Sequence, residues 1–275
     1  MPLDNVNNYF QEIPYHLDFS VSYEPTKVRD KRYVINNSTG EYLGIVGDKF
    51  NCANHTEFFH GVQGAMLENL SAEELSNIKT KWKTARNNAW ALMDVTLPNV
   101  NRKIVTDKHE TTVAQRVIGL HGVDGSCSNM VFFGAIDFFC TNGQISGDHS
   151  KVKRKNTTFF SMDRFIDELL SSKQEFYAQA SRLQDMANTS LMSVDVKSLL
   201  ESIIKSDKKA EKMFTLYNQE VSTRGRNAFA LYSAFTNYAS YADERNGFTL
   251  RRTGADNDNV NMFNREHEVA QWIET

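Results

Sequence analysis

The spacing of apolar residues along the chain changes near residue 160. Between residues 30 and 145 the apolar residues alternate with polar ones or form short runs, which is typical of β-strands. Beyond residue 160 they recur every three or four residues, which is typical of amphipathic helices. The pattern predicts an α+β fold in which an antiparallel sheet with packed helices is followed by an all-helical C-terminal lobe.

This change of period divides the chain into three expected segments. Residues 1–26 are polar and aromatic without a period, so we expect an arm that packs on the surface or on a neighbouring subunit; a floppy terminus is the alternative. Residues 27–158 are expected to form the mixed sheet and helix core, and residues 159–275 the helical lobe. We expect core and lobe to form one continuous globular unit.

The strongest strand signals lie between residues 113 and 143. Val113–Leu120 predicts one strand, and a glycine-containing turn over 121–126 joins it to the nearly all-apolar run Met130–Cys140. Such a run predicts a strand that is covered on both faces, and the single charge inside it is Asp137. We expect this hairpin to form the centre of the sheet.

Turn and capping signals predict the remaining elements. Residues 31–50 predict a hairpin around a turn at 36–40. A short helix is expected after Asn54, and the capping box of Ser71 and Glu74 predicts a second helix that runs to about Arg86, with an apolar stripe of Leu75, Ile78 and Trp82. Further strands are expected at 90–97, 102–107 and 112–120, and further helices over 161–187, from 193 to about 204, and over 208–221, 226–244 and 259–273.

Composition and charge narrow the class of protein. The net charge of −3 gives no general attraction to nucleic acid. Cys52, Cys127 and Cys140 form no CxxC pair, so we expect a reducing, cytoplasmic location with neither disulfides nor a structural zinc site. We expect neither a signal peptide nor a membrane span, because no apolar run approaches ~20 residues. Nucleotide-binding and hydrolase motifs are missing, so nothing in the sequence points to a cofactor or an enzyme.

Two basic clusters are the best binding signal in the sequence. Residues 151–155 carry four positive charges in five positions, namely Lys151, Lys153, Arg154 and Lys155. The predicted helix after Ser71 carries Lys79, Lys81, Lys83 and Arg86. Cations gathered in this way neutralise phosphates, so we predict a nucleic-acid site; a solvated charge run is the alternative. We expect Trp82 to be a core anchor rather than a base-stacking platform.

A second candidate is the turn that contains His121 and Asp124. Together with His149, these residues could hold a metal or form an acid/base pair. The alternative is a hydrogen-bonded turn in which Asp124 accepts from backbone N–H groups. No HExxH or DxD motif accompanies them, so we predict no metal site.

Several motifs resemble, in their order, a large phage and plasmid family that is classed as a domain of unknown function. They are the hairpin GEYLGIVGDKF, the turn HGVDGS, the strand end FFCTNG, the DHSK segment and the late helix RGRNAFALYSAFTNYASY. The resemblance covers residues 31–245, and the chain departs from it at Asp137, where family members usually carry Arg. In layout the family is similar to phage recombination and single-strand annealing proteins, the group of Red-beta and RecT.

This resemblance implies a function that composition alone does not. We expect a phage single-stranded-DNA-binding protein in the cytoplasm of an infected bacterium, with strand annealing as a homo-oligomer as its candidate activity. One alternative is a phage protein that binds and counters a host defence or restriction protein. The other is a metal-dependent enzyme at His121, Asp124 and His149.

Overall fold

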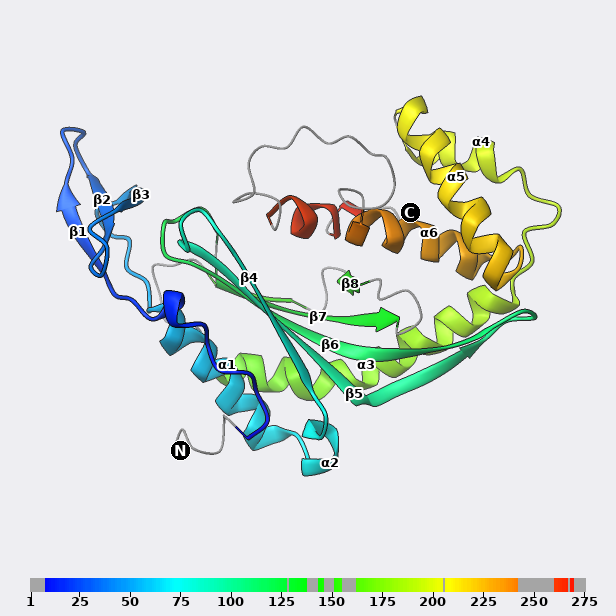
Figure 1. Cartoon of the computed structure of the whole chain (residues 1–275), viewed down its shortest axis with the longest axis horizontal. Coiled ribbons are helices and arrows are strands. Elements are labelled where there is room, and N and C mark those ends of the chain that lie inside the picture. The colour runs from blue at the N-terminus through cyan, green and yellow to red at the C-terminus, as the bar shows by residue number, and fades with distance from the viewer. Residues whose placement is uncertain are drawn as a thin grey trace.

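The computed structural model of the chain describes residues 8–127, 129–137, 143–145, 151–154, 162–204, 206–241, 260–266 and 268–269. For residues 143–145, 151–154, 162–165 and 168 it describes the backbone alone. The elements run from a small N-terminal sheet through a large central sheet to a helical lobe (Figure 1).

The small sheet contains three antiparallel strands in the order β1-β2-β3. Their bounds are Val21–Pro25 for β1, Lys31–Asn36 for β2 and Tyr42–Gly47 for β3. The pairing of β2 with β3 confirms the predicted hairpin. The expected arm supplies β1, and before it a 3₁₀ turn at Tyr15–Leu17. Phe10 and Leu17 are buried in the main core, so the described part of the arm packs against the body of the protein.

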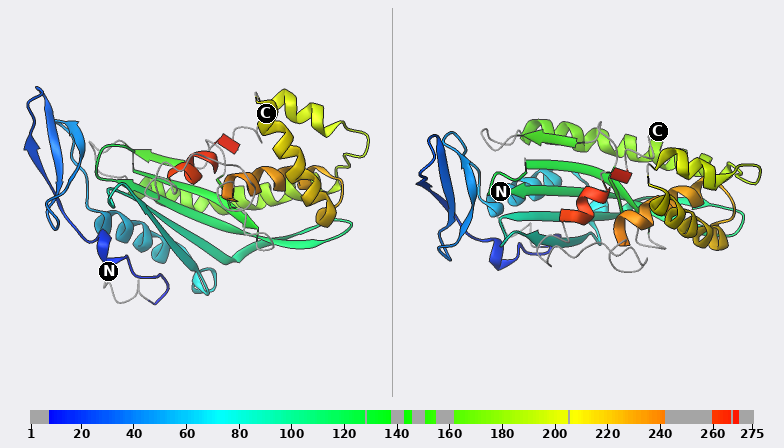
Figure 2. Two further views of the ribbon diagram at one scale, coloured as in Figure 1. Left: turned by 45° about the horizontal axis from the view of Figure 1, so that its top comes forward. Right: turned by 90° about the horizontal axis from the view of Figure 1, so that it is seen from above.

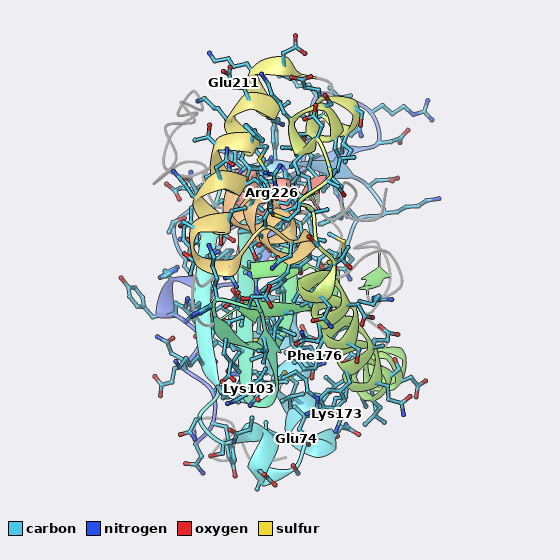
Figure 3. The ribbon with its side chains drawn as sticks, turned by 90° about the vertical axis from the view of Figure 1, so that its right-hand side faces the viewer. Glu74, Lys103, Lys173, Phe176, Glu211 and Arg226 are labelled. Carbon is cyan, nitrogen blue, oxygen red and sulfur yellow. The ribbon has the colours of Figure 1, made fainter. Side chains whose placement is uncertain are left out.

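Two helices follow the small sheet, α1 (His55–Asn69) and α2 (Ala72–Leu75). The predicted capping box is confirmed, because the backbone N–H of Glu74 donates to the Ser71 hydroxyl and the Glu74 carboxylate accepts from the Ser71 backbone. Lys173 of the long helix α3 (Met162–Asn188) pairs with Glu74 at 2.7 Å, which ties α2 to α3 (Figure 3).

The predicted continuation of this helix to Arg86 is wrong. The helix ends at Leu75, Asn77 takes the left-handed conformation with a φ of 60°, and strand β4 (Lys79–Ala85) begins. The spacing of Leu75, Ile78 and Trp82 fits a helix, but lysine and non-lysine residues alternate strictly from 79 to 83, which is the period of a strand. Hydrogen bonding of β4 along strand β5 (Trp90–Val105) stabilises the extended conformation.

A six-stranded antiparallel sheet forms the centre of the protein, in the order β4-β5-β6-β7-β8, with β9 also paired to β7. The other strands are β5 (Trp90–Val105), β6 (Glu110–Gly122), β7 (Asn129–Asp137), β8 (Gly143–Ile145) and β9 (Lys151–Arg154). The predicted central hairpin is confirmed as β6 and β7, and β7 is buried on both faces. The two strands predicted at 90–97 and 102–107 are one strand with an irregularity between Leu97 and Asn101.

Helices dominate the chain after the sheet, as the change of period predicts. They are α3 (Met162–Asn188), α4 (Val196–Ile203), α5 (Asp207–Arg224) and α6 (Ala228–Tyr241). Residues 260–266 and 268–269 are also helical, and we call them the C-terminal helix. The α+β class is therefore confirmed. No helix of the described residues combines the length and the apolar character that crossing a bilayer requires.

The central sheet has two differently covered faces (Figures 1 and 2). Helices α1 and α3 pack on one, which we call the helix face, and bury a large apolar core there. The other carries Trp90, Leu92, Ile118, Leu120 and Phe132, against which Phe263 of the C-terminal helix packs. We call it the C-terminal face. The β4 lysines lie on the C-terminal face, which makes it the candidate binding surface.

Candidate nucleic-acid interface

Strand β4 places three of the predicted lysines on the C-terminal face. In register, Lys79 pairs with Thr96, Lys81 with Asp94 and Lys83 with Leu92. Antiparallel partners share a face, and Leu92 belongs to the apolar cluster beneath the C-terminal helix. Between the lysines, Trp82 lies on the helix face, where its ring meets that of Phe59 at 4.9 Å. Trp82 is thus a core anchor, as expected, and the β4 lysines belong to the opposite face.

The three lysines differ in exposure. Lys79 and Lys81 are exposed near the open edge of the sheet. Lys83 is partly buried, with its Nζ 3.4 Å from the Met262 sulfur of the C-terminal helix. Burial lowers the pKa of the Lys83 ammonium group, and the nearby Glu266 carboxylate opposes that shift.

A buried ion cluster lies next to Lys83. The guanidinium of Arg116 donates from Nε and Nη2 to the two oxygens of Asp94, both at 2.8 Å, and from Nη1 to Glu266 Oε2 at 2.8 Å. We call these three residues the Arg116 cluster. Burial alone would raise the pKa of Asp94, but the charge and hydrogen bonds of Arg116, together with the charges of Lys83 and Lys81, hold that pKa below its usual value. The C-terminal face therefore has a charged centre under the C-terminal helix.

The second predicted basic cluster lies at the opposite edge of the same sheet. Strand β9 pairs with β7, with Lys151 opposite Phe132 and Lys153 opposite Met130. Phe132 lies on the C-terminal face, so positions 151 and 153 share that face with the β4 lysines. Arg154 stands opposite Asn129 on the alternate face, and Lys155 lies outside the described residues.

Arg86 is the fourth predicted cation of the first cluster, and it lies in the turn between β4 and β5. Arg86, Asn87 and Asn88 all adopt left-handed conformations, with φ of 56°, 52° and 64°. Each such residue costs about 1 kcal/mol. The Arg86 side chain turns to Asp124, with Nη1 3.6 Å from Oδ2, so its charge is partly neutralised within the protein.

Asp124 forms the hydrogen-bonded turn that was the alternative to a catalytic role. Its Oδ1 accepts from the backbone N–H of Ser126 at 2.9 Å. The turn packs against the small sheet so closely that a Cβ at Gly44 would stand 2.9 Å from the Asp124 carbonyl oxygen. The hairpin and the HGVDGS turn, two of the resemblance motifs, therefore meet in space, and glycine at 44 is required for their contact.

His121 lies in the core rather than in a site open to solvent. Its Nδ1 is 2.8 Å from Nδ1 of His55, whose Nε2 is 2.8 Å from the carbonyl oxygen of Asn88. Since that carbonyl can only accept, His55 carries its proton on Nε2 and accepts from His121. The rings of Phe58 and Phe59 pack against the pair. Burial lowers the pKa of His55 to about 4 and that of His121 well below its usual value, so both are neutral.

The described residues do not support a metal site at these positions. They contain no group of three or more His, Cys, Asp or Glu side chains that could hold an ion. His121 contacts His55 while Asp124 contacts Arg86, and His149 lies outside the described residues. The enzyme alternative of the sequence analysis therefore gains no support.

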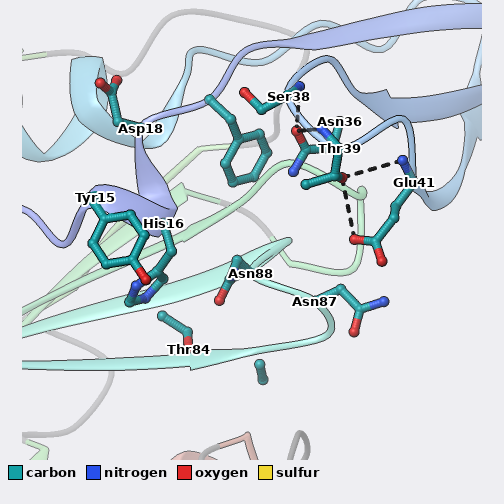
Figure 4. A pocket seen from close by; sticks show the side chains of 12 residues that line it. Tyr15, His16, Asp18, Asn36, Ser38, Thr39, Glu41, Thr84, Asn87 and Asn88 are labelled. Atoms are coloured by element: carbon teal, nitrogen blue, oxygen red, sulfur yellow. Dashed lines mark hydrogen bonds between the residues drawn. The ribbon is translucent and has the colours of Figure 1, made fainter.

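A polar pocket of about 490 Å³ opens beside the β4–β5 turn (Figure 4). The 3₁₀ turn with Tyr15 and the β2–β3 turn form its other walls, and Asn87 and Asn88 line it as well. Asp18 and Glu41 are its charged residues, and none of its described lining residues is Lys or Arg. The pocket therefore does not suit a phosphate.

Comparison with known proteins gives one match. A family model described as Domain of unknown function (DUF932) matches residues 42–265, which is most of the chain. The chain belongs to the DUF932 family. No curated protein and no solved structure matches it. The resemblance to a family of unknown function is thereby confirmed, while the phage setting and the likeness to annealing proteins stay predictions.

The DUF932 match extends from β3 to the C-terminal helix and includes a second buried ion cluster. Arg224 of α5 donates from Nη2 to Asp137 at 2.7 Å and from Nε to Glu220 at 2.9 Å. We call these three residues the Arg224 cluster. Thr111 donates to the other oxygen of Asp137, and Asn237 donates to the other oxygen of Glu220 at 3.1 Å. Asp137, the position at which the chain departs from the family pattern, thus supplies a carboxylate from β7 that accepts a hydrogen bond from Arg224.

Neither Arg116 nor Arg224, the two arginines at the centres of these clusters in the DUF932 domain, was among the site residues predicted from the sequence. Arg116 stands in an apolar strand, and Arg224 stands next to Gly225 and Arg226 at the end of a predicted helix. A signal was present, because an isolated charge in an otherwise apolar strand requires a buried partner of opposite sign. Asp94, Arg116 and Asp137 all meet that description. The sequence alone does not show which of these residues pair, because the pairing depends on the strand register.

Proposed function

We propose that this DUF932 protein binds single-stranded nucleic acid, in the first place single-stranded DNA, through the C-terminal face of its central sheet. One observation carries the proposal. The basic positions of β4 and β9 lie some seventy residues apart in the sequence, yet their register assigns residues 79, 81, 83, 151 and 153 to one face of one sheet.

The spacing of these positions suits a polymer rather than a small anion. Strands β4 and β9 are separated by β5, β6 and β7, which puts their rows roughly 19 Å apart at the usual strand spacing. The aromatic residues Trp90 and Phe132 lie on the same face between the two rows. Proteins that hold single strands without sequence preference combine a basic track with aromatic side chains in this way.

Titration of the protein with labelled oligothymidylate, and with a duplex of equal length, tests the proposal. Affinity for the single strand should fall steeply with salt, because each neutralised phosphate adds about 0.7 to the slope of log affinity against log salt. The exposed pair Lys79→Ala/Lys81→Ala should lower that slope by about 1.4. A matched control, Lys197→Ala/Lys208→Ala, removes two exposed lysines from α4 and α5 and should leave the slope unchanged.

Two outcomes would overturn the proposal. One is the absence of binding to a long oligothymidylate at low salt. The other is an equal effect of both variant pairs, which would mean that any surface lysine contributes alike.

Binding of a protein partner, such as a host defence protein, remains the second candidate. The small sheet favours it, since Tyr42 and Ile45 of its edge strand β3 are 64% and 60% exposed. Retention of a defined partner after nuclease treatment, together with no affinity for oligothymidylate, would favour this function instead.

A further inference from the structure

The C-terminal helix lies on the middle of the proposed binding face (Figure 2). Phe263 is its main apolar contact, with ring centres 5.3 Å from Phe132 and 6.3 Å from Trp90. Met262 covers the Lys83 ammonium group at 3.4 Å. The helix therefore covers the region between the β4 and β9 rows.

The charges beneath the helix are not balanced without it. Asp94 binds Arg116 through both oxygens and neutralises it from within the sheet. Lys83 adds a further positive charge beside this pair. Glu266 supplies the second carboxylate of the Arg116 cluster, and it comes from an element 150 positions further along the chain. Without Glu266, this part of the face would carry one net positive charge.

The covered surface has the composition of a binding site. It offers two cationic side chains, Arg116 and Lys83, and two aromatic ones, Trp90 and Phe132. Single-strand binding surfaces hold phosphates with cations and stack bases on aromatic rings. Glu266 presents a carboxylate to the cations and Phe263 presents a ring to the aromatic pair, so the helix makes the two kinds of contact that a nucleotide would make.

We infer that the surface beneath the C-terminal helix is part of the nucleic-acid site, and that the helix and a single strand compete for it. Phosphates of the strand take the position of the Glu266 carboxylate, and a base takes the position of the Phe263 ring. This inference rests on the proposed function. The apparent affinity for the strand is then reduced by the fraction of molecules in which the helix is bound.

Two single substitutions in the same helix test the inference. Glu266→Gln weakens the contact with Arg116, whereas Glu268→Gln makes the same change of charge at a residue that pairs with Lys209 of α5 at 2.9 Å. Glu266→Gln should bind oligothymidylate about fivefold more tightly than the unaltered protein, which is the lower end of typical coupling between sites. Glu268→Gln, at a partly exposed pair, should change affinity by less than about twofold.

A third variant separates the contact from its charge. Phe263→Ala loosens the helix with no change of charge and should also tighten binding, and it keeps the test decisive if Glu266→Gln folds poorly in a thermal melt. Equal gains for Glu266→Gln and Glu268→Gln would overturn the inference, because net charge alone would explain them. So would unchanged affinity in Glu266→Gln and Phe263→Ala while the unaltered protein binds. If the unaltered protein does not bind at all, the proposed function itself fails.

Discussion

The Arg116 and Arg224 clusters are chemically alike and differ in how firmly their carboxylates are held. Each places one arginine, 3% or less exposed, between a strand aspartate and a helix glutamate. In the Arg224 cluster, hydroxyl or amide groups of other elements also donate to both carboxylates. In the Arg116 cluster, among the residues that the structure describes, the second oxygen of Glu266 reaches only the same guanidinium, at 3.5 Å.

The origin of the glutamate also separates the two clusters. Glu220 lies one turn before Arg224 on the same helix, so it cannot leave without unfolding α5. Glu266 belongs to the C-terminal helix, which takes part in none of the strand pairings of the described residues, so its release would break none of them. A buried ion pair is weak evidence for stability in itself. We interpret the Arg224 cluster as a permanent link between the sheet and the helical lobe, and the Arg116 cluster as a contact that a ligand can replace.

Removal of the central arginine should produce the largest measurable difference between the two clusters. Arg224→Met leaves Asp137 and Glu220 buried without their cation and should lower the free energy of unfolding by about 3–5 kcal/mol. Arg116→Met should cost roughly half as much, because Lys83 remains nearby and release of the C-terminal helix exposes the two acids to water. Chemical denaturation of both variants measures the difference. Equal losses of unfolding free energy would contradict the distinction between a permanent link and a replaceable contact.

Between pH 6.5 and pH 4, acid should weaken the fold through the histidine pair. Both histidines are neutral in the folded protein, and the pKa of His55 is about 4 against an ordinary value of 6.5. Between these values the unfolded chain takes up a proton and the folded protein does not, so stability falls as the pH drops from 6.5 to 4. The loss from His55 reaches about 3 kcal/mol near pH 4 and is absent above pH 6.5.

Denaturation curves across this pH range provide the check. The double variant His55→Phe/His121→Phe should flatten the decline, since phenylalanine fills the site between Phe58 and Phe59 without a titrating group. A decline that survives the double histidine replacement would show that another group titrates.

Local patterns predicted much of this fold, and the register decided the rest. The capping box of Ser71 and Glu74, the apolar run of β7 and the helical period after residue 160 each specify an element through near neighbours in the sequence. The β4 segment was misread because three apolar residues happen to fit a helical stripe, while its pairing with β5 determines its conformation. Pairing between strands is a long-range property that periodicity does not contain.

The same limit applied to the candidate site. Lysines 79, 81 and 83 could be named from their clustering, but their shared face with positions 151 and 153 follows only from strand order and register. The pairing of Glu266 with Arg116 could not be predicted from the sequence for a further reason. The two residues are 150 positions apart. Arg116 stands alone in an apolar strand, whereas Glu266 lies between Arg265 and Glu268, and nothing in that charged stretch marks it as the partner of Arg116.

Hydrogen exchange with and without oligothymidylate tests the central claim most directly. If a single strand replaces the C-terminal helix on the sheet, the amides of residues 260–266 should exchange faster in the complex, while the Arg224 cluster and its helix α5 stay equally protected. Slower or unchanged exchange in residues 260–266, in a sample whose DNA is fully bound, would contradict the account.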